Sequence, residues 1–251
     1  SITPVLQAGS QDHQLQWQFN SNGASFDALA LGESLTLRYR VQVSDGAGEV
    51  DQHWITIRID GRNDAPVLFN TANDAVLNLQ LNETNSGLTG HGSFRLSDLD
   101  LNDVVRASVS AVSTSGTTTG LLPNQAQLLA MLQVSPDPVL NDQRTSSEGR
   151  LTWSFNSGTE AFDYLGAGQT LNLTYTIQIN DGQGGTASQD VGVVINGSND
   201  RPFITIGNAD TATALLTETN AGLTTAGTLS IADPDLNTAS LTPNPVSYTH
   251  L

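Results

Sequence analysis

The sequence predicts an all-β chain of tandem antiparallel β-sandwich repeats, with one short helix in the complete repeat. Three observations lead to this prediction: a long internal period, runs in which apolar and polar residues alternate, and turn-forming residues between those runs. A period of this kind is typical of arrays of structural units, and alternation is typical of half-buried strands. Short strands separated by turns favour a sandwich.

The period is marked by Gly-x-Asn-Asp-x-Pro at Gly61–Pro66, which returns at Gly197–Pro202, an offset of 136 residues. The preceding landmarks recur at the same offset: Trp17 as Trp153, Phe26-Asp27 as Phe162-Asp163, Leu35 as Leu171, Tyr39 as Tyr175, and Asp45-Gly46 as Asp181-Gly182. We call these two stretches the first and the second junction. They predict the end of one repeat (1–67), a complete repeat (68–203) and the start of a third (204–251), with 243–251 off register.

Alternation predicts the strands in each repeat. The alternating runs lie at 15–19, 35–43 and 55–59, at the matching stretches 151–155 and 171–179, and around 94–96 and 104–111. We expect residues 67–81 to be extended and the small, polar stretch 113–120 to form a loop.

One stretch after Pro123 predicts the helix. Asn124 as N-cap and Gln127 three residues later form a capping-box pattern. The apolar residues Leu128, Leu129, Met131 and Leu132 follow. Pro136 and Pro138 are expected to stop the helix, which we expect to cover an open edge or end of the sandwich.

The composition narrows the range of possible functions. The net charge is -16, with nine arginines, no lysine and no cysteine. Such a chain is repelled by nucleic acid and anionic membranes, and no apolar run is long enough to span a bilayer. The carboxylates either bind a hard cation or only solvate the surface. The four histidines are scattered and no nucleophile motif appears, so we do not expect an enzyme.

Strand direction places the acidic residues at the two ends of the complete repeat. The first junction is expected to gather Asn63, Asp64, Asp98, Asp100 and Asp181. The second is expected to gather Glu83, Asp163, Asn199, Asp200, Asp233 and Asp235. Oxygen ligands from two repeats suit calcium better than magnesium, whose octahedral geometry is strict. Taken alone, Asp45-Gly46 or Asp181-Gly182 is more often a hairpin turn than a ligand, and the Phe-Asp pair of Phe26-Asp27 and Phe162-Asp163 could equally be a corner motif.

These motifs resemble a known family. Leu-x-Trp-x-Phe, Phe-Asp-x-Leu-x-x-Gly, Asp-Gly-x-Gly and Gly-x-Asn-Asp-x-Pro are similar to the VCBS repeat, one of the bacterial cadherin-like and immunoglobulin-like repeats. The resemblance covers residues 15 to about 237. Each junction also resembles the cadherin linker Asp-x-Asn-Asp-Asn-x-Pro. Gly61 and Gly197 replace its first Asp, and Ala65 and Arg201 replace its last Asn, which favours one or two ions at each junction over three.

The resemblance implies an extender segment of a large secreted adhesin, located at the bacterial cell surface and exported by type I secretion, as in calcium-dependent RTX adhesins. Such a segment would support adhesion or biofilm formation. Its partners would be adjacent repeats of the same chain, with surface or matrix glycans and proteins bound by other domains. An alternative is a carbohydrate-binding module, for which the predicted loop at 113–120 is the main support.

Overall fold

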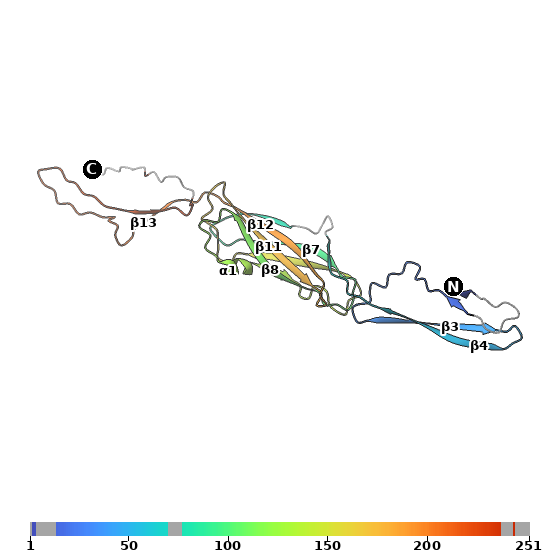
Figure 1. Ribbon diagram of the computed structural model, residues 1–251. Coiled ribbons are helices and arrows are strands. Elements are labelled where there is room, and N and C mark those ends of the chain that lie inside the picture. The colour runs from blue at the N-terminus through green and yellow to red at the C-terminus, as the bar shows by residue number, and fades with distance from the viewer. Residues whose placement is uncertain (1, 4–13, 70–76, 237–242, 244–251) are drawn as a thin grey trace.

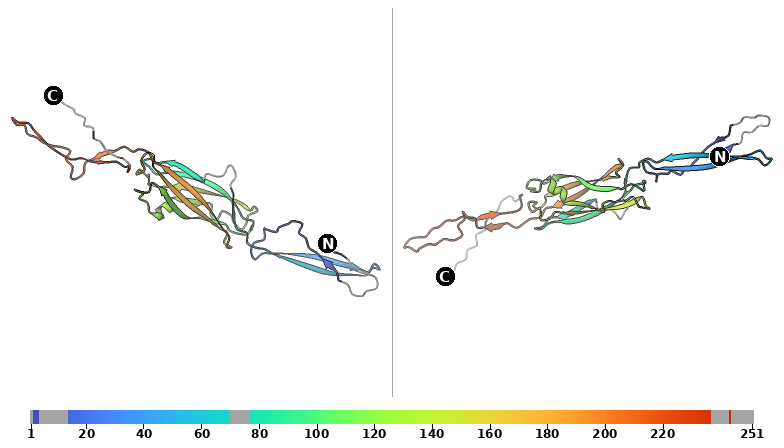
Figure 2. Two further views of the ribbon diagram at one scale, coloured as in Figure 1. Left: turned by 45° about the horizontal axis from the view of Figure 1, so that its top comes forward. Right: turned by 90° about the horizontal axis from the view of Figure 1, so that it is seen from below.

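The chain is described by a computed structural model that covers residues 2–3, 14–69, 77–236 and 243. Figure 1 shows an elongated arrangement with one β-sandwich at its centre and thinner β segments on either side. The first junction connects the sandwich to the paired strands β3 (Ser34–Ser44) and β4 (Val50–Asp60), and the second connects it to β13 (Phe203–Thr205). The two further views in Figure 2 show the same end-to-end order.

Within the described residues, the central sandwich contains eight strands and one helix. They are β5 (Val67–Phe69), β6 (Asn78–Asn82), β7 (Thr89–Ser97), β8 (Arg106–Gly116), α1 (Gln125–Ala130), β9 (Leu132–Ser135), β10 (Glu148–Asn156), β11 (Thr170–Asn180) and β12 (Thr186–Asn196). One sheet has the order β5-β7-β10-β9 and the other β6-β12-β11-β8. All neighbours are antiparallel except β6 and β12. When β5 and β6 are lettered A and A′ and strands β7 to β12 are lettered B to G, the sheets are ABED and A′GFC, as in an immunoglobulin-like fold, so the predicted fold class is confirmed.

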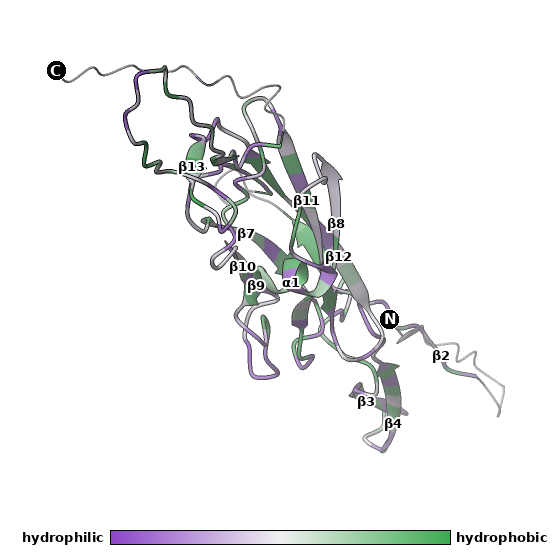
Figure 3. Ribbon diagram, turned by 90° about the vertical axis from the view of Figure 1, so that its left-hand side faces the viewer, coloured by the Kyte–Doolittle hydropathy of each residue, from purple (hydrophilic) through white to green (hydrophobic). Residues whose placement is uncertain are grey.

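The core lies between the two sheets. Every second residue of β11 is fully buried, as the alternation predicts: Leu171, Leu173, Tyr175, Ile177 and Ile179. Val191, Val193 and Ile195 of β12 and the aromatic residues Trp153 and Phe155 of β10 complete this layer. Each large apolar side chain contributes about 1.5–3 kcal/mol when it leaves water. Figure 3 shows the hydropathy of the residues along these strands.

The helix α1 forms at the predicted place with the predicted capping box. It contacts β8 and β9, and the Tyr175 hydroxyl donates to the Leu128 carbonyl oxygen at 3.0 Å. Its predicted end was wrong: the helix stops at Ala130, and Leu132–Ser135 form β9 because they pair with β10. The two prolines therefore follow a strand.

The predicted loop at 113–120 was also partly wrong. Residues 113–116 continue β8 and pair with β11, where their backbone groups gain ladder hydrogen bonds that a local pattern does not reveal. Of this stretch only 117–120 lie in a loop, which continues to residue 124 before α1 begins. Within the predicted extended segment 67–81, β5 and β6 are observed, whereas residues 70–76 lie outside the described residues, as do 244–251 of the off-register tail. The repeat boundaries stay predictions.

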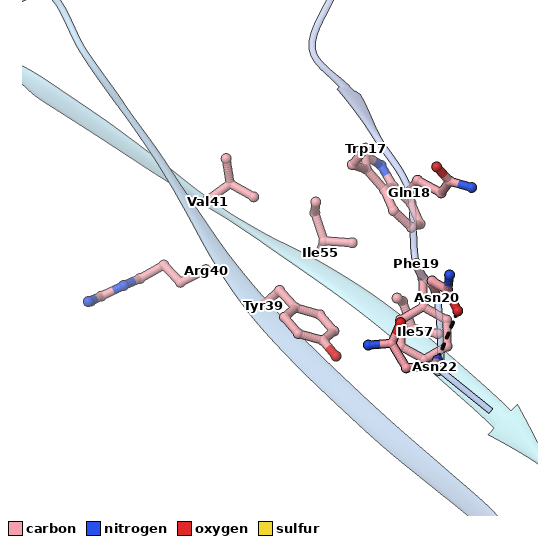
Figure 4. A pocket seen from close by; sticks show the side chains of 10 residues that line it. All are labelled: Trp17, Gln18, Phe19, Asn20, Asn22, Tyr39, Arg40, Val41, Ile55 and Ile57. Atoms are coloured by element: carbon pink, nitrogen blue, oxygen red, sulfur yellow. Dashed lines mark hydrogen bonds between the residues drawn. The ribbon is translucent and has the colours of Figure 1, made fainter. Parts of the chain in front are cut away.

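The first repeat carries the same pattern without the same burial. Its strands are β1 (Ile2–Thr3), β2 (Gln16–Trp17), β3 (Ser34–Ser44) and β4 (Val50–Asp60). Figure 4 shows Trp17, Phe19, Tyr39 and Ile55 lining one hollow over β3 and β4. The ring centroids of Phe19 and Tyr39 lie 6.5 Å apart, close to the 6.3 Å between the ring centroids of Phe155 and Tyr175. Tyr39 is nevertheless 47% exposed. The third repeat contributes β13 (Phe203–Thr205) and β14 (Ser230–Ala232).

Candidate metal centre at the repeat junctions

Each junction begins with a glycine that leaves no room for a side chain. The Gly61 amide donates to the Glu33 carbonyl at 2.9 Å, and the Gly197 amide donates to the Gln169 carbonyl at 2.9 Å. A Cβ on either glycine would lie 2.2 Å from a backbone carbonyl oxygen, that of Leu29 or of Leu165. A side chain cannot be accommodated at that distance. This packing explains why neither junction has the Asp that opens the cadherin linker.

The two junctions then make the same pair of contacts. The Asp64 amide donates to Asp100 Oδ2 at 2.7 Å, and the Asp200 amide donates to Asp235 Oδ2 at 2.9 Å. Within each Asp-x-Asp motif the second amide donates to the first carboxylate, at 2.9 Å in 98–100 and 3.1 Å in 233–235. Each linker is therefore held by the acidic loop of the repeat that follows it.

A cluster of three carboxylates lies at the first junction. Asp98, Asp100 and Asp103 are buried, with exposed fractions of 1%, 0% and 4%, and each offers a carboxylate oxygen within 4.8 Å of the others. Asp98 Oδ2, Asp100 Oδ1 and Asp103 Oδ2 have no hydrogen-bond partner. The side-chain oxygen of Asn63 is buried and unpartnered as well. A buried polar atom left unpaired in this way calls for a water or an ion.

Asp181 joins the same end of the sandwich and has two roles. Its Oδ1 accepts from the amides of Gln183 at 2.7 Å and Gly185 at 2.9 Å, which closes the hairpin turn between β11 and β12. Its Oδ2 accepts from the Asn63 side chain at 2.9 Å, across the junction. The turn interpretation of Asp-Gly is thus compatible with a contact to the linker beside the cluster.

The second junction holds another cluster, formed mainly by the complete repeat. Glu83, Asp163 and Asp200 offer oxygens within 4.8 Å of one another. Glu83 Oε1 accepts from the Ser198 amide at 2.8 Å, and Asp200 Oδ1 accepts from the Asn85 side chain at 3.0 Å. The other oxygens, Glu83 Oε2, Asp163 Oδ1, Asp200 Oδ2 and Asp235 Oδ1, are buried without partners.

Burial and mutual repulsion make these carboxylates harder to ionise. Burial raises the pKa of Asp98 to about 6, even though the Asp100 amide and the Arg144 guanidinium oppose the shift. Burial also raises the pKa of Asp103 and Asp100, with added repulsion from Asp181. At the second junction burial raises the pKa of Asp163, reinforced by Asp200 and Glu83. A bound cation would reverse this cost, because it stabilises the ionised form.

The structure brings together most of the residues that the sequence assigned to each junction. Asn63, Asp64, Asp98, Asp100 and Asp181 meet at the first, and Glu83, Asp163, Asp200 and Asp235 meet at the second. Asp233 contacts the cluster through Asp235, because Asp233 Oδ1 accepts a hydrogen bond from the Asp235 amide. Asn199 is exposed, and its side chain donates to the adjacent Asp200 carbonyl at 2.9 Å rather than into the cluster.

Three neighbours were not among the predicted site residues. Asp103 is a full member of the first cluster, and its place in the acidic loop 98–103 is a sequence signal that could have found it. Glu33 accepts a hydrogen bond from the Asn102 side chain, so the first repeat also reaches this loop. Arg144 lies beneath the loop, and no local motif marks it.

The donor set fits a hard cation. At the second cluster every unpartnered oxygen belongs to a carboxylate. At the first cluster the carboxamide oxygen of Asn63 lies with the unpartnered carboxylate oxygens. Calcium takes six to eight such ligands in flexible geometry, whereas zinc favours nitrogen and sulfur. Asn63, Asp98, Asp100, Asp103 and Asp181 would hold an ion at the first junction, and Glu83, Asp163, Asp200 and Asp235 at the second.

Comparisons with known proteins yield structural likenesses only. No protein-family model and no curated protein matches the chain. Protocadherin gamma B2, extracellular cadherin domains 1–5, is 20% identical over 67% of this chain and 26% of its own, with a TM-score of 0.35. Mouse protocadherin-24, domains 1–3, is 15% identical over 80% of this chain and 56% of its own, with a TM-score of 0.33. A PapD-like domain of human CEP192 is 10% identical, covers 54% and 86%, and has a TM-score of 0.32.

The chain therefore spans about a quarter to a half of the two protocadherin chains. The assignment of the fold rests on the strand order described above rather than on these values. Among the described residues, no helix has the length and apolar character needed to cross a membrane.

Proposed function

We propose that this chain is an extender segment of a bacterial surface or secreted adhesin, of the VCBS type, stiffened by calcium at each junction. One observation carries the proposal: at both junctions, buried carboxylate oxygens without partners lie beside the linker, together with the Asn63 carboxamide oxygen at the first and with Asp235 of the next repeat at the second. The linker contacts that recur at 2.7 and 2.9 Å tie these oxygens to the chain segment between the repeats.

Such an arrangement couples ion binding to the angle between repeats. Several buried carboxylates repel one another in the absence of a cation, because Coulomb energies are large where water is excluded. A bound ion removes that repulsion only while both repeats hold their ligands in place. Binding therefore favours the docked arrangement over a bent one.

The expected stabilisation is modest at each site. Extracellular calcium modules bind with a dissociation constant of roughly 0.1–1 mM, and about ten times that concentration adds about 1.4 kcal/mol per site. Repeated along an array, this effect would keep a long stalk extended. The segment itself is proposed to be non-enzymatic, with the adhesive target bound elsewhere in the parent protein and with the neighbouring repeats as its direct partners.

Calcium titration by isothermal calorimetry tests the proposal, with magnesium as the competing ion. We expect calcium binding in the range of about 0.1–1 mM and much weaker magnesium binding. A chain that binds neither ion, or binds magnesium equally well, would contradict the proposal.

A matched pair of variants locates the binding. Asp181 and Asp45 occupy equivalent positions and close the same hairpin turn, since Asp45 Oδ1 accepts from the Ala47 amide at 2.8 Å and the Glu49 amide at 3.1 Å. In the described structure Asp181 also faces Asn63 across the first junction, whereas Asp45 is exposed. Asp181→Asn should therefore weaken calcium binding by about tenfold, and Asp45→Asn should leave it unchanged.

A further inference from the structure

Arg144 lies beneath the acidic loop of the first junction. It belongs to the segment between β9 and β10, and its side chain is only 7% exposed. Few arginines are available in this chain, and a buried guanidinium is costly unless its donors are satisfied. Its Nε is buried without a hydrogen-bond partner, so the contacts of Nη1 and Nη2 show what the side chain does.

Those contacts are mostly to backbone oxygens of the loop. Nη2 donates to the carbonyl of Asp100 at 2.5 Å and to that of Asp98 at 3.4 Å, and Nη1 donates to the carbonyl of Asp103. Nη1 also donates to the carbonyl of Asn141 at 3.2 Å. Among the described residues, Arg144 forms one ion pair, between Nη2 and Asp98 Oδ1 at 3.6 Å.

One guanidinium thus holds the peptide groups of the same three residues whose carboxylates form the first cluster. The carbonyls of Asp98, Asp100 and Asp103 are occupied by Arg144, while Asp98 Oδ2, Asp100 Oδ1 and Asp103 Oδ2 have no hydrogen-bond partner. Each of the three carboxylates offers an oxygen within 4.8 Å of the others. The planar fork of an arginine presents five donors in a fixed geometry that can bridge separate oxygens, whereas a lysine presents three donors on a single nitrogen.

We propose that Arg144 is a positioning residue that holds the 98–103 loop in its ion-binding shape before the ion arrives. This inference rests on the calcium function proposed above. A positive charge beside a cation site weakens binding by repulsion, whereas a preformed loop strengthens it by sparing the cost of ordering. The geometry favours the second effect, because three of the loop contacts are to carbonyls and only one is to a carboxylate.

The two effects predict opposite results for Arg144→Met. If repulsion dominates, the variant binds calcium more tightly. If positioning dominates, it binds more weakly, by about 10- to 100-fold, as is typical when a residue that orients metal ligands is lost. Arg144→Lys retains the charge but not the fork, so we expect it to bind more weakly than the parent as well.

The experiment uses the full chain carrying Asp163→Asn and Asp200→Asn, so that the calorimetric signal comes from the first junction. Arg144→Met, Arg144→Lys and Arg106→Met are compared with this parent. Arg106 is a matched control because it lies at the same end of the sandwich, is exposed and pairs with Asp137 at 3.0 Å. We expect Arg106→Met to change the affinity less than about twofold.

Hydrogen exchange of residues 98–103 supplies a second measurement that needs no calcium. We expect faster exchange in calcium-free Arg144→Met and Arg144→Lys, with slow exchange restored by saturating calcium. Equal or tighter calcium binding by both Arg144 variants, or unchanged loop exchange, would overturn the inference. A parent that binds no calcium would instead overturn the proposed function, and the inference with it. Should Arg144→Met fail to fold, the affinity of Arg144→Lys decides.

Discussion

At the first junction the clustered carboxylates come from the repeat that follows, whereas at the second they come mainly from the repeat that precedes. The first has Asp98, Asp100 and Asp103. The second has Glu83 and Asp163, joined by Asp200 of the linker. Since the two junctions are copies of one pattern, each displays one side of the same site. A complete junction combines both sides around the linker.

The contacts shared by both junctions identify what each repeat boundary needs. These are the glycine without room for a Cβ, the linker amide bound to the second Asp of Asp-x-Asp, and the amide of that Asp bound to the first. The differences between the two junctions identify positions that can change the calcium affinity. Glu33 at the first junction corresponds to Gln169 in the next repeat, and both side chains accept a backbone amide at 3.0 Å.

Removing carboxylates from one junction should have the largest effect. Asp98→Asn with Asp100→Asn should abolish calcium binding at the first junction, and Asp163→Asn with Asp200→Asn should abolish it at the second. We expect a loss of at least about 100-fold at the altered site, because affinity depends on the number of charged ligands. Calorimetry would show one class of sites disappearing in each variant. Loss of all binding from either pair would mean that the junctions are not separate sites.

The junction glycines should give the next largest effect. Gly197→Ala places a methyl group 2.2 Å from the Leu165 carbonyl oxygen and should lower the free energy of unfolding of the sandwich by about 1–3 kcal/mol. Gly61→Ala creates the same clash outside the sandwich, against Leu29. It should leave the sandwich melting temperature unchanged and weaken calcium binding at the first junction. Melting curves that are identical for Gly197→Ala and the wild type would contradict the packing argument.

The dependence on pH should be smaller and should differ in sign with and without calcium. The pKa of Asp98 is raised in the folded chain to about 6, so its ionised form is disfavoured by folding. Its contribution to stability in calcium-free buffer is therefore present at low pH and is lost as the pH rises from about 4 through 6. Calcium requires the ionised form, so the calcium-induced rise in melting temperature should grow over the same range.

Thermal unfolding from pH 4.5 to 7.5, with and without calcium, checks both signs. Asp98→Asn should flatten the calcium-free profile near pH 6, because the titrating group is gone. A calcium-free profile that rises steadily toward pH 7.5 would show that the carboxylates at the junctions do not set it.

Exchanging the residues at positions 33 and 169 should give the smallest effect. Glu33 adds to the repulsion that Asp100 and Asp103 experience. Glu33→Gln should weaken calcium binding at the first junction by about two- to fivefold, as expected for a partly screened charge. Gln169→Glu should strengthen binding at the second by a similar factor. Equal calcium affinities of the wild type, Glu33→Gln and Gln169→Glu would show that this residue pair does not cause a difference between the junctions.

Much of the site could be predicted because its residues lie at strand ends and recur with a fixed period. The period identified Asn63-Asp64 and Asn199-Asp200 as linkers, and strand direction placed Asp98 and Asp181 at one end and Glu83 at the other. Alternation similarly predicted the buried face of β11. These features are set by local sequence and by the direction of neighbouring strands, which a single sequence reveals.

The remaining features depend on partners distant in sequence. Arg144 binds carbonyls of residues more than 40 positions earlier, and carbonyl oxygens leave no mark in a sequence. The end of α1 is set by the pairing of β9 with β10. Asn63 faces Asp181, whereas the Asn199 side chain donates to the Asp200 carbonyl, so the two asparagines differ in the structure although they match in the sequence.

A distance measurement across the first junction tests the central claim most directly. The chain has no cysteine, so Thr36→Cys on β3 and Gln178→Cys on β11, both exposed, can carry a pair of spin labels. If calcium fixes the angle between repeats, the distance distribution should be broad in calcium-free buffer and narrow at saturating calcium. Thr174→Cys with Thr205→Cys should show the same change across the second junction. Distributions of equal width with and without calcium would contradict the claim.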